Sequence, residues 1–245
     1  MKKPIVLVHG LFGHLNDPKI LGSIGEFDVF APDLLGYGEH SAVQIDAIAL
    51  EDQADHVARY IQNNDLGTVN LVGHSVGGAV AVLVAKNYPQ MVISLTSVEG
   101  NFTLKDAFWS GQIAQKPLPE VEQIVDGYKA DPDSWISGAG VPLDEWTKAL
   151  ARSWLNNQPA STIKAQARAV VEATGKPDYL DSIRSLITSN LPFHLIAGER
   201  SRDGWDVPEW AAKLATSNYN IPNTGPLMMA EDPEGFGLAV RERQQ

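Results

Sequence analysis

The chain has 245 residues, of which 44% are hydrophobic and 20% charged, and its formal net charge is −11 at pH 7. This composition excludes a disordered chain, and the negative charge excludes nucleic acid as the main partner. The sequence contains no cysteine, which excludes disulfides, thiolate metal sites and a cysteine nucleophile. The first apolar run covers only residues 5–8, too few for a signal peptide or a membrane span. We therefore expect a soluble, cytoplasmic protein with no membrane partner.

Short β-branched runs alternate with longer amphipathic stretches along the chain. This alternation is typical of βαβ units and predicts an α/β fold with a mostly parallel sheet flanked by helices. The runs that predict strands are residues 4–8, 27–30, 68–72, 92–98, 191–197 and 219–221. The stretches that predict helices are residues 46–62, 76–88 and 207–216, and a last helix from about residue 231.

Between residues 104 and 186 the strand-like runs disappear and helical stretches are separated by prolines. We predict an α/β core of residues 1–103 and 187–245, interrupted by a helical cap of residues 104–186. The inserted segment contains four of the six tryptophans, Trp109, Trp135, Trp146 and Trp154. These side chains fit either the core of a helical subdomain or a lid over an apolar pocket, and the sequence leaves both open.

The motif Gly73-His74-Ser75-Val76-Gly77 follows a predicted strand and precedes a predicted helix. In that setting G-x-S-x-G predicts a nucleophile elbow. The sharp turn holds the serine backbone in a strained conformation, and the glycines allow neighbouring strands to approach closely. The serine hydroxyl then stands clear of the sheet, at a helix N-terminus whose N–H groups can stabilise an anion.

The elbow and two further motifs identify a resemblance to the α/β-hydrolase family, specifically to members with a cap domain. The further motifs are His9-Gly10-Leu11-Phe12-Gly13 after the first strand and the segment from Pro32-Asp33 to Gly38 after the second. The resemblance extends over nearly the whole chain. It implies that the backbone N–H groups of Leu11 and Val76 form an oxyanion hole and that Ser75 is the nucleophile.

The resemblance also implies a carboxylate that orients the catalytic base, and two positions compete for it. Most family members place this acid after the strand that follows the cap, as G-x-x-D, but here Ser201 occupies that position and Asp203 comes two residues later. The haloalkane dehalogenase branch places the acid after the strand that precedes the cap, where this chain has Glu99. We favour Glu99 over Asp203. Either residue could instead cap a neighbouring backbone N–H group.

The family's base histidine is missing from its expected position, where this chain has Pro226. Proline cannot accept a proton, so Pro226 marks a vacant base position. We expect His9 and His74 to be structural, with the His74 side chain pointing away from the side of the base. His56 and His194 fit surface or core positions, whereas His14 and His40 lie on loops near the expected site. A single base change separates a His codon from a Pro codon, so Pro226 is either natural divergence or a variant.

Three functions compete on this basis. The first is a serine hydrolase acting on a small, largely apolar ester, lactone, thioester or amide, and catalytically impaired by Pro226. The second is a non-catalytic binding protein or receptor for a small molecule. The third, dehalogenation or cofactor-free oxygenation, is disfavoured, because dehalogenation needs an aspartate where Ser75 stands and oxygenation needs the missing histidine. The sequence indicates no metal site and no cofactor, and it leaves a homo-oligomer open.

Overall fold

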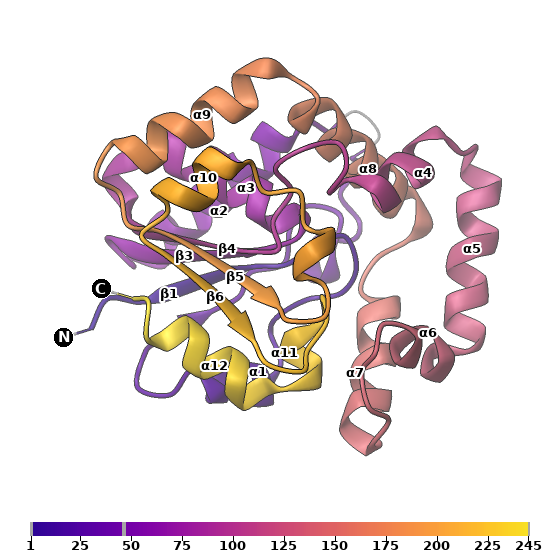
Figure 1. Ribbon diagram of the computed structural model, residues 1–245. Helices are drawn as coiled ribbons and strands as arrows, with labels where there is room; N and C mark the ends of the chain where they lie inside the picture. Colours follow the sequence, from indigo (N-terminus) through magenta and orange to yellow (C-terminus); the bar gives the residue numbers. More distant parts are fainter. Residues whose placement is uncertain (1, 46–47, 245) are drawn as a thin grey trace.

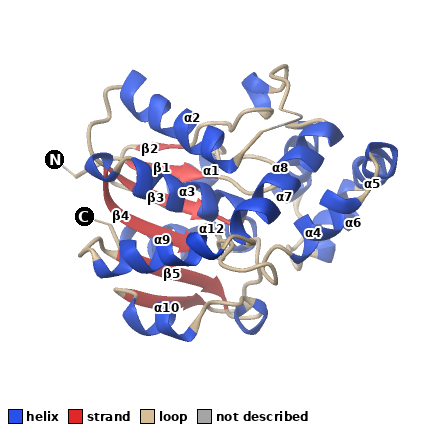
Figure 2. Cartoon of the chain, turned by 90° about the horizontal axis from the view of Figure 1, so that it is seen from above, coloured by secondary structure: helices blue, strands red, loops and turns tan. Residues whose placement is uncertain are grey.

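The computed structural model describes residues 2–45 and 48–244. Within these ranges, six strands form one sheet in the order β2-β1-β3-β4-β5-β6, and every neighbouring pair is parallel (Figure 2). The strands are β1 (Ile5–Val8), β2 (Val29–Phe30), β3 (Val69–His74), β4 (Val92–Val98), β5 (Phe193–Gly198) and β6 (Ser217–Ile221). The structure therefore confirms the predicted α/β fold with a mostly parallel sheet.

Helices cover both faces of this sheet (Figure 1). One face carries α2 (Leu50–Asn63), α3 (Val76–Asn87), α9 (Pro177–Thr188) and α10 (Glu209–Leu214). The opposite face carries α1 (Pro18–Ser23), α11 (Met228–Glu231) and α12 (Pro233–Arg241). Because both faces are covered, the central strands are buried on both sides, which explains why β1 is a continuous apolar run rather than an alternating one.

Five further helices follow β4: α4 (Phe108–Gln115), α5 (Leu118–Ala130), α6 (Pro132–Gly138), α7 (Glu145–Asn156) and α8 (Ala160–Thr174). Helices α4 to α7 lie beyond one end of the sheet (Figure 1). Helix α8 connects the two parts, because it contacts α4 and α5 on one side and α2 and α3 on the other. The division into a core and a cap at residues 104 and 186 stays a prediction.

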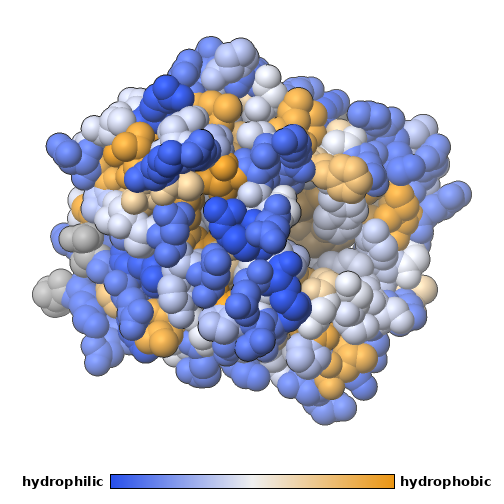
Figure 3. Space-filling view, in the orientation of Figure 1, coloured by the Kyte–Doolittle hydropathy of each residue, from blue (hydrophilic) through white to orange (hydrophobic). Residues whose placement is uncertain are grey.

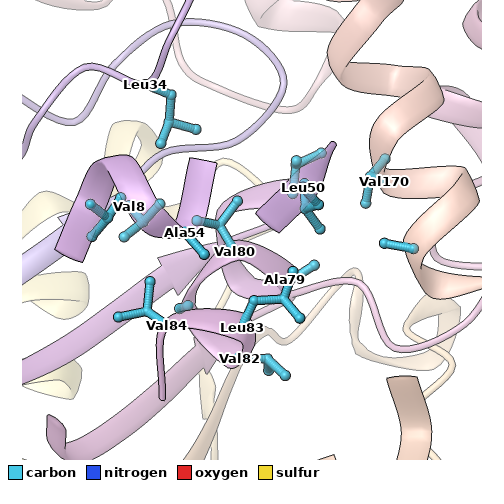
Figure 4. Packing of buried hydrophobic residues seen from close by; sticks show 14 of the residues in the cluster. Val8, Leu34, Leu50, Ala54, Ala79, Val80, Val82, Leu83, Val84 and Val170 are labelled. Carbon is cyan, nitrogen blue, oxygen red and sulfur yellow. The ribbon is translucent and has the colours of Figure 1, made fainter. Parts of the chain in front are cut away.

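Helix α3 is the centre of the larger hydrophobic core (Figure 4). Its residues 76–85 are all buried, and side chains such as Val80 and Val84 pack near Val8 of β1 and Ala54 of α2. A helix that is apolar on every side must be enclosed on every side. This burial fixes the N-terminus of α3, which follows Ser75 directly.

Three short or terminal parts of the elements differ from the prediction: the start of β2, the start of α2, and the whole of α1. Strand β2 contains only Val29–Phe30 of the predicted residues 27–30. Helix α2 begins at Leu50, and residues 46 and 47 of the predicted helix lie outside the described residues. Helix α1 was not predicted, although Asp17 accepts hydrogen bonds from the Lys19 and Ile20 N–H groups at its N-terminus.

Candidate active site

A cavity of about 540 Å³ lies at the end of the sheet that faces α4–α7. Figure 3 shows a hollow to the right of its centre, between the sheet part of the molecule and these helices. The predicted site residues Leu11, Ser75, Glu99 and Pro226 all line the cavity, whereas Val76 is not among its lining residues. The cavity therefore brings together residues from four separate loops of the sheet.

Ser75 lies in the strained turn that the motif predicts. Its φ and ψ angles are 53° and −123°, a combination that non-glycine residues rarely adopt. The turn is held by hydrogen bonds from Ser75 N to the Val98 carbonyl at 3.0 Å and from Gly78 N to the Ser75 carbonyl at 2.8 Å. A Cβ atom on Gly77 would overlap the carbonyl oxygens of Val8 and His9, so glycine is required there.

The loop of residues 9–13, here called the His-Gly loop, is held in place by the ring of His9. The Leu34 N–H group donates to His9 Nε2 at 3.1 Å, so the ring proton lies on Nδ1, which donates to the Gly10 carbonyl at 2.9 Å. Burial lowers the pKa of His9 to about 4, which keeps the ring neutral near pH 7. The predicted structural role of His9 is consistent with these contacts.

The far end of the His-Gly loop is attached to the helices outside the sheet. Gly13 N donates to Gln158 Oε1 at 3.1 Å, and Asn157 Nδ2 donates to the Gly13 carbonyl at 3.0 Å. Among the described residues, the Leu11 N–H group has no acceptor. The Val76 N–H group is the first of α3, where intrahelical acceptors are absent. Both groups remain available for the oxyanion role that the resemblance implies.

Glu99 follows β4 directly, with a positive φ of 42°, and its carboxylate reaches the loop after β5. Glu99 Oε1 accepts hydrogen bonds from Gly198 N at 2.8 Å and from Ser201 Oγ at 2.5 Å. Burial raises the pKa of Glu99, and these two hydrogen bonds act in the opposite direction. Ser201 stands where the resemblance would place an aspartate. Its hydroxyl donates a hydrogen bond to the carboxylate of Glu99, which follows β4 rather than β5. Sequence reasoning missed this pairing.

The alternative acid, Asp203, does not line the cavity. It lies in the short 3-10 helix Arg202–Gly204 and is exposed to solvent. The structure therefore brings Glu99, and not Asp203, to the same cavity as Ser75.

Residues 222–227, here called the Pro226 loop, follow β6 and are anchored by Glu231 of α11. Glu231 Oε1 accepts from Gly225 N at 2.8 Å, and Glu231 Oε2 pairs with Arg200 Nη2 at 2.6 Å. The Glu231 side chain is only 4% exposed. Because Gly225 precedes Pro226, this pair determines where the Pro226 residue lies.

The orientation predicted for His74 is wrong. Its ring lines the cavity, and Nε2 donates to the Pro226 carbonyl at 3.0 Å, on the side of the missing base. Burial lowers the pKa of His74 to about 4. Within the described part of the chain, no side chain forms a hydrogen bond with Ser75 Oγ. His74 therefore holds the backbone of the Pro226 loop and does not act on the serine hydroxyl.

The other four histidines are engaged elsewhere. His14 lines the cavity, with Nε2 at 2.8 Å from Ser153 Oγ. His194 lies in β5 with Nδ1 at 2.9 Å from Ser217 Oγ, as expected for a core position. His40 and His56 contact each other edge to face with ring centroids 4.6 Å apart. None of these contacts involves Ser75.

Residues 2–45 and 48–244 contain neither a cluster of metal ligands nor a membrane-spanning helix. These ranges contain no group of three or more His, Asp or Glu side chains placed to bind a metal ion. No helix in them is both long and apolar enough to span a bilayer.

Comparison with known proteins identifies the family of this chain. The model of the alpha/beta hydrolase family matches residues 5–237. The chain belongs to this family. Among solved structures, a carboxylesterase from the thaumarchaeon Nitrososphaera gargenis superposes with a TM-score of 0.74 over 98% of this chain and 92% of that one, at 19% identity. At this identity the likeness shows the shared fold only.

Two curated relatives resemble only part of the chain. Ethanol acetyltransferase 1 of Eremothecium cymbalariae is 35% identical over 102 residues, which are 40% of this chain and 28% of that protein. Lipase 1 of Psychrobacter immobilis is 32% identical over 113 residues, 45% of this chain and 34% of that protein. The matches thus span about a third of each relative's length.

Proposed function

We propose that the chain is a serine-hydrolase scaffold for a small, largely apolar ester, lactone, thioester or amide. The observation that carries the proposal is the strained Ser75 turn at a cavity lined by Trp109, Trp135 and Trp154. Ser75 Oγ bonds to the carbonyl carbon as its C=O π bond opens, the N–H groups of Leu11 and Val76 stabilise the oxyanion, and the hydroxyl proton passes to water because position 226 holds no base. The carbonyl then re-forms with release of the alcohol, thiol or amine, and water hydrolyses the acyl-serine. The lipase and acyltransferase relatives, which match part of the chain, support acyl chemistry as the class.

Glu99 would orient a base at position 226, and that base is missing. In another serine hydrolase, loss of the base alone lowers the rate about 10⁶-fold. What remains there, from the oxyanion hole and substrate binding, is about 10³–10⁴ over water. We therefore expect this chain to hydrolyse esters very slowly.

His74 does not compensate for the loss. Its Nε2–H group is used by the Pro226 carbonyl, and a pKa of about 4 makes the remaining nitrogen a weak base near pH 7. The same hydrogen bond does not depend on the side chain at position 226, because it is made to the backbone. A histidine introduced there would retain this anchor.

The test is to restore the base and measure both labelling and turnover. We expect Pro226→His to react with a fluorophosphonate probe within minutes and to hydrolyse short p-nitrophenyl esters about 10²–10⁴ times faster than the unaltered chain. Pro226→Ala is the matched control and should gain nothing, because it removes the proline ring without adding a base. If the folded Pro226→His variant gains neither labelling nor turnover, the hydrolase proposal is wrong.

A non-catalytic binding protein is the second candidate, favoured by one observation: the cavity persists although position 226 holds proline. This function requires that the unaltered chain binds a small ligand and that Ser75→Ala leaves the affinity unchanged. Calorimetric titration with a short ester measures both quantities. A large loss of affinity in Ser75→Ala would contradict this alternative.

A further inference from the structure

Buried polar atoms without hydrogen-bond partners concentrate at the cavity. The described residues contain seven such side-chain atoms, and three belong to residues that line the cavity: His14 Nδ1, Asn101 Oδ1 and Trp154 Nε1. Folded proteins leave few buried polar groups unpaired, and those that occur call for an explanation. All three residues lie in the wall of the cavity, where a bound molecule can contact the accessible parts of the same side chains.

Asn101 is the best placed of the three to contact a bound molecule. Its backbone is held on both sides, because its N–H group donates to the Ser75 carbonyl at 3.3 Å and its carbonyl accepts from Tyr179 Oη at 2.7 Å. The residue is only 4% exposed, and its backbone contact with Ser75 places it beside the turn that carries the serine. Oδ1 has no partner, and no hydrogen bond from Nδ2 is found within the described residues.

Trp154 lies on the other side of Ser75. Its ring packs directly on Gly13 of the His-Gly loop, which follows β1, whereas Asn101 follows β4. In the sheet, β1 and β4 flank β3, the strand that leads to Ser75. The cavity thus has an unpaired polar side chain on each side of the nucleophile, although the aromatic side chains make much of its wall apolar.

The charged side chains of the cavity do not favour a charged ligand. Lys105 Nζ pairs with Asp206 at 3.3 Å, and Arg200 pairs with Glu231 at 2.6 Å. Asp106 accepts hydrogen bonds from the backbone N–H groups of Phe102, Thr103 and Asp206. Because each of these charges already has a partner, the unpaired carboxamide of Asn101 fits a neutral polar group better than a carboxylate.

We propose that Asn101 is a specificity-determining residue that selects esters carrying a second, neutral oxygen, as a hydroxyl or keto group, near the ester carbonyl. Asn101 Nδ2 is not among the buried unpaired atoms and can donate to the oxygen of such a hydroxyl or keto group at the cavity wall. The inference rests on the proposed function, because it concerns the substrate of Ser75. A site built to hydrogen-bond a substrate oxygen discriminates against the analogue that lacks it.

The test compares two esters that differ by one oxygen, ethyl 3-hydroxybutanoate and ethyl butanoate, by calorimetric titration of the unaltered chain. We expect the hydroxy ester to bind about tenfold more tightly, as one net hydrogen bond would give. Asn101→Leu should remove this preference, so that its affinities for the two esters lie within about twofold of each other. Asn156→Leu, the same change on the exposed surface of α7, is the control and should keep the preference.

A second measurement does not depend on how well Asn101→Leu folds. In the ¹H–¹⁵N spectrum of the unaltered chain, the side-chain amide resonances of Asn101 should shift with the hydroxy ester and much less with ethyl butanoate. Equal affinity for the two esters, no binding of either, or a preference that survives in Asn101→Leu would overturn the inference. These experiments need no attack by Ser75. If the unaltered chain prefers the hydroxy ester but Pro226→His gains no activity, only the proposed function is contradicted. If Pro226→His gains activity but the two esters bind equally, only this inference is contradicted.

Discussion

The turn that carries Ser75 and the loop that carries Pro226 both follow strands of the same sheet, but different forces hold them. The Ser75 turn is fixed by backbone contacts, since Gly77 packs against carbonyl groups of β1 and α3 is buried on all sides. The Pro226 loop is fixed by side chains, through Glu231, Arg200 and His74. Backbone packing tolerates few substitutions, whereas a loop held by side chains can change the residue at its tip and keep its shape. This difference explains how the residue at position 226 can vary while the Ser75 turn is kept.

The largest expected effect concerns the acid and assumes that Pro226→His is active. Adding Glu99→Gln to that variant should remove most of the activity gained with Pro226→His, a fall in kcat of up to about 10²–10⁴-fold, because the introduced base loses the carboxylate that orients it. Asp203→Asn is the matched control and should leave kcat within about twofold, because Asp203 is exposed and outside the cavity. Rates with p-nitrophenyl acetate measure both. The opposite ranking would assign the acid to Asp203.

The second prediction tests the backbone packing of the Ser75 turn. Gly77→Ala should lower the free energy of unfolding by about 3 kcal/mol, since the added methyl group overlaps backbone oxygens that cannot move independently. Gly111→Ala in α4 is the control: no atom lies within 4 Å of the added carbon, and alanine should stabilise the helix by about 0.5–1 kcal/mol. Urea unfolding measures both values. Equal effects would show that the turn is not crowded.

The third prediction tests the side-chain anchor of the Pro226 loop. Arg200→Met should lower the free energy of unfolding by about 1–2 kcal/mol, because the carboxylate of Glu231 stays buried without its cation. The value is modest because the Arg200 side chain is 46% exposed. Lys213→Met, which breaks the exposed pair with Glu209, should cost no more than about 0.5 kcal/mol. A loss as small for Arg200→Met would mean that the pair does not anchor the loop.

The smallest expected effect is a pH dependence from a histidine outside the site. Burial lowers the pKa of His194 to about 4, so between pH 6.5 and 4 the unfolded chain binds a proton there that the folded chain does not. Stability is therefore complete above pH 6.5 and falls as the pH decreases. His194→Asn should reduce the slope of unfolding free energy against pH by up to about 1.4 kcal/mol per unit. Urea unfolding at pH 7, 6 and 5 tests this, and an unchanged slope would assign the acid sensitivity to other groups such as His9 and His74.

Elements with strong local signals were predicted well. The Gly73–Gly77 motif, between an apolar strand and an apolar helix, correctly predicts the strained turn, and the helix predicted at residues 76–88 matches α3 to within one residue. Short elements such as β2 and α1 were predicted poorly, because a few residues carry little periodicity. The orientation of His74 could not be predicted, since it depends on a contact with Pro226, 152 residues away in the sequence.

By itself the sequence determined the α/β class, the family and the position of Ser75, because these depend on apolar periodicity and on glycines a few residues apart. It also determined that position 226 holds no base. Only the tertiary structure decided that Glu99 and Ser201 meet and that Asp203 lies outside the cavity. It also decided that Asn101 Oδ1 and Trp154 Nε1, in residues that line the same cavity as Ser75, have no hydrogen-bond partner. The physical reason is that each of these relations joins loops from different strands, and their distances depend on how the strands and helices pack rather than on any local pattern.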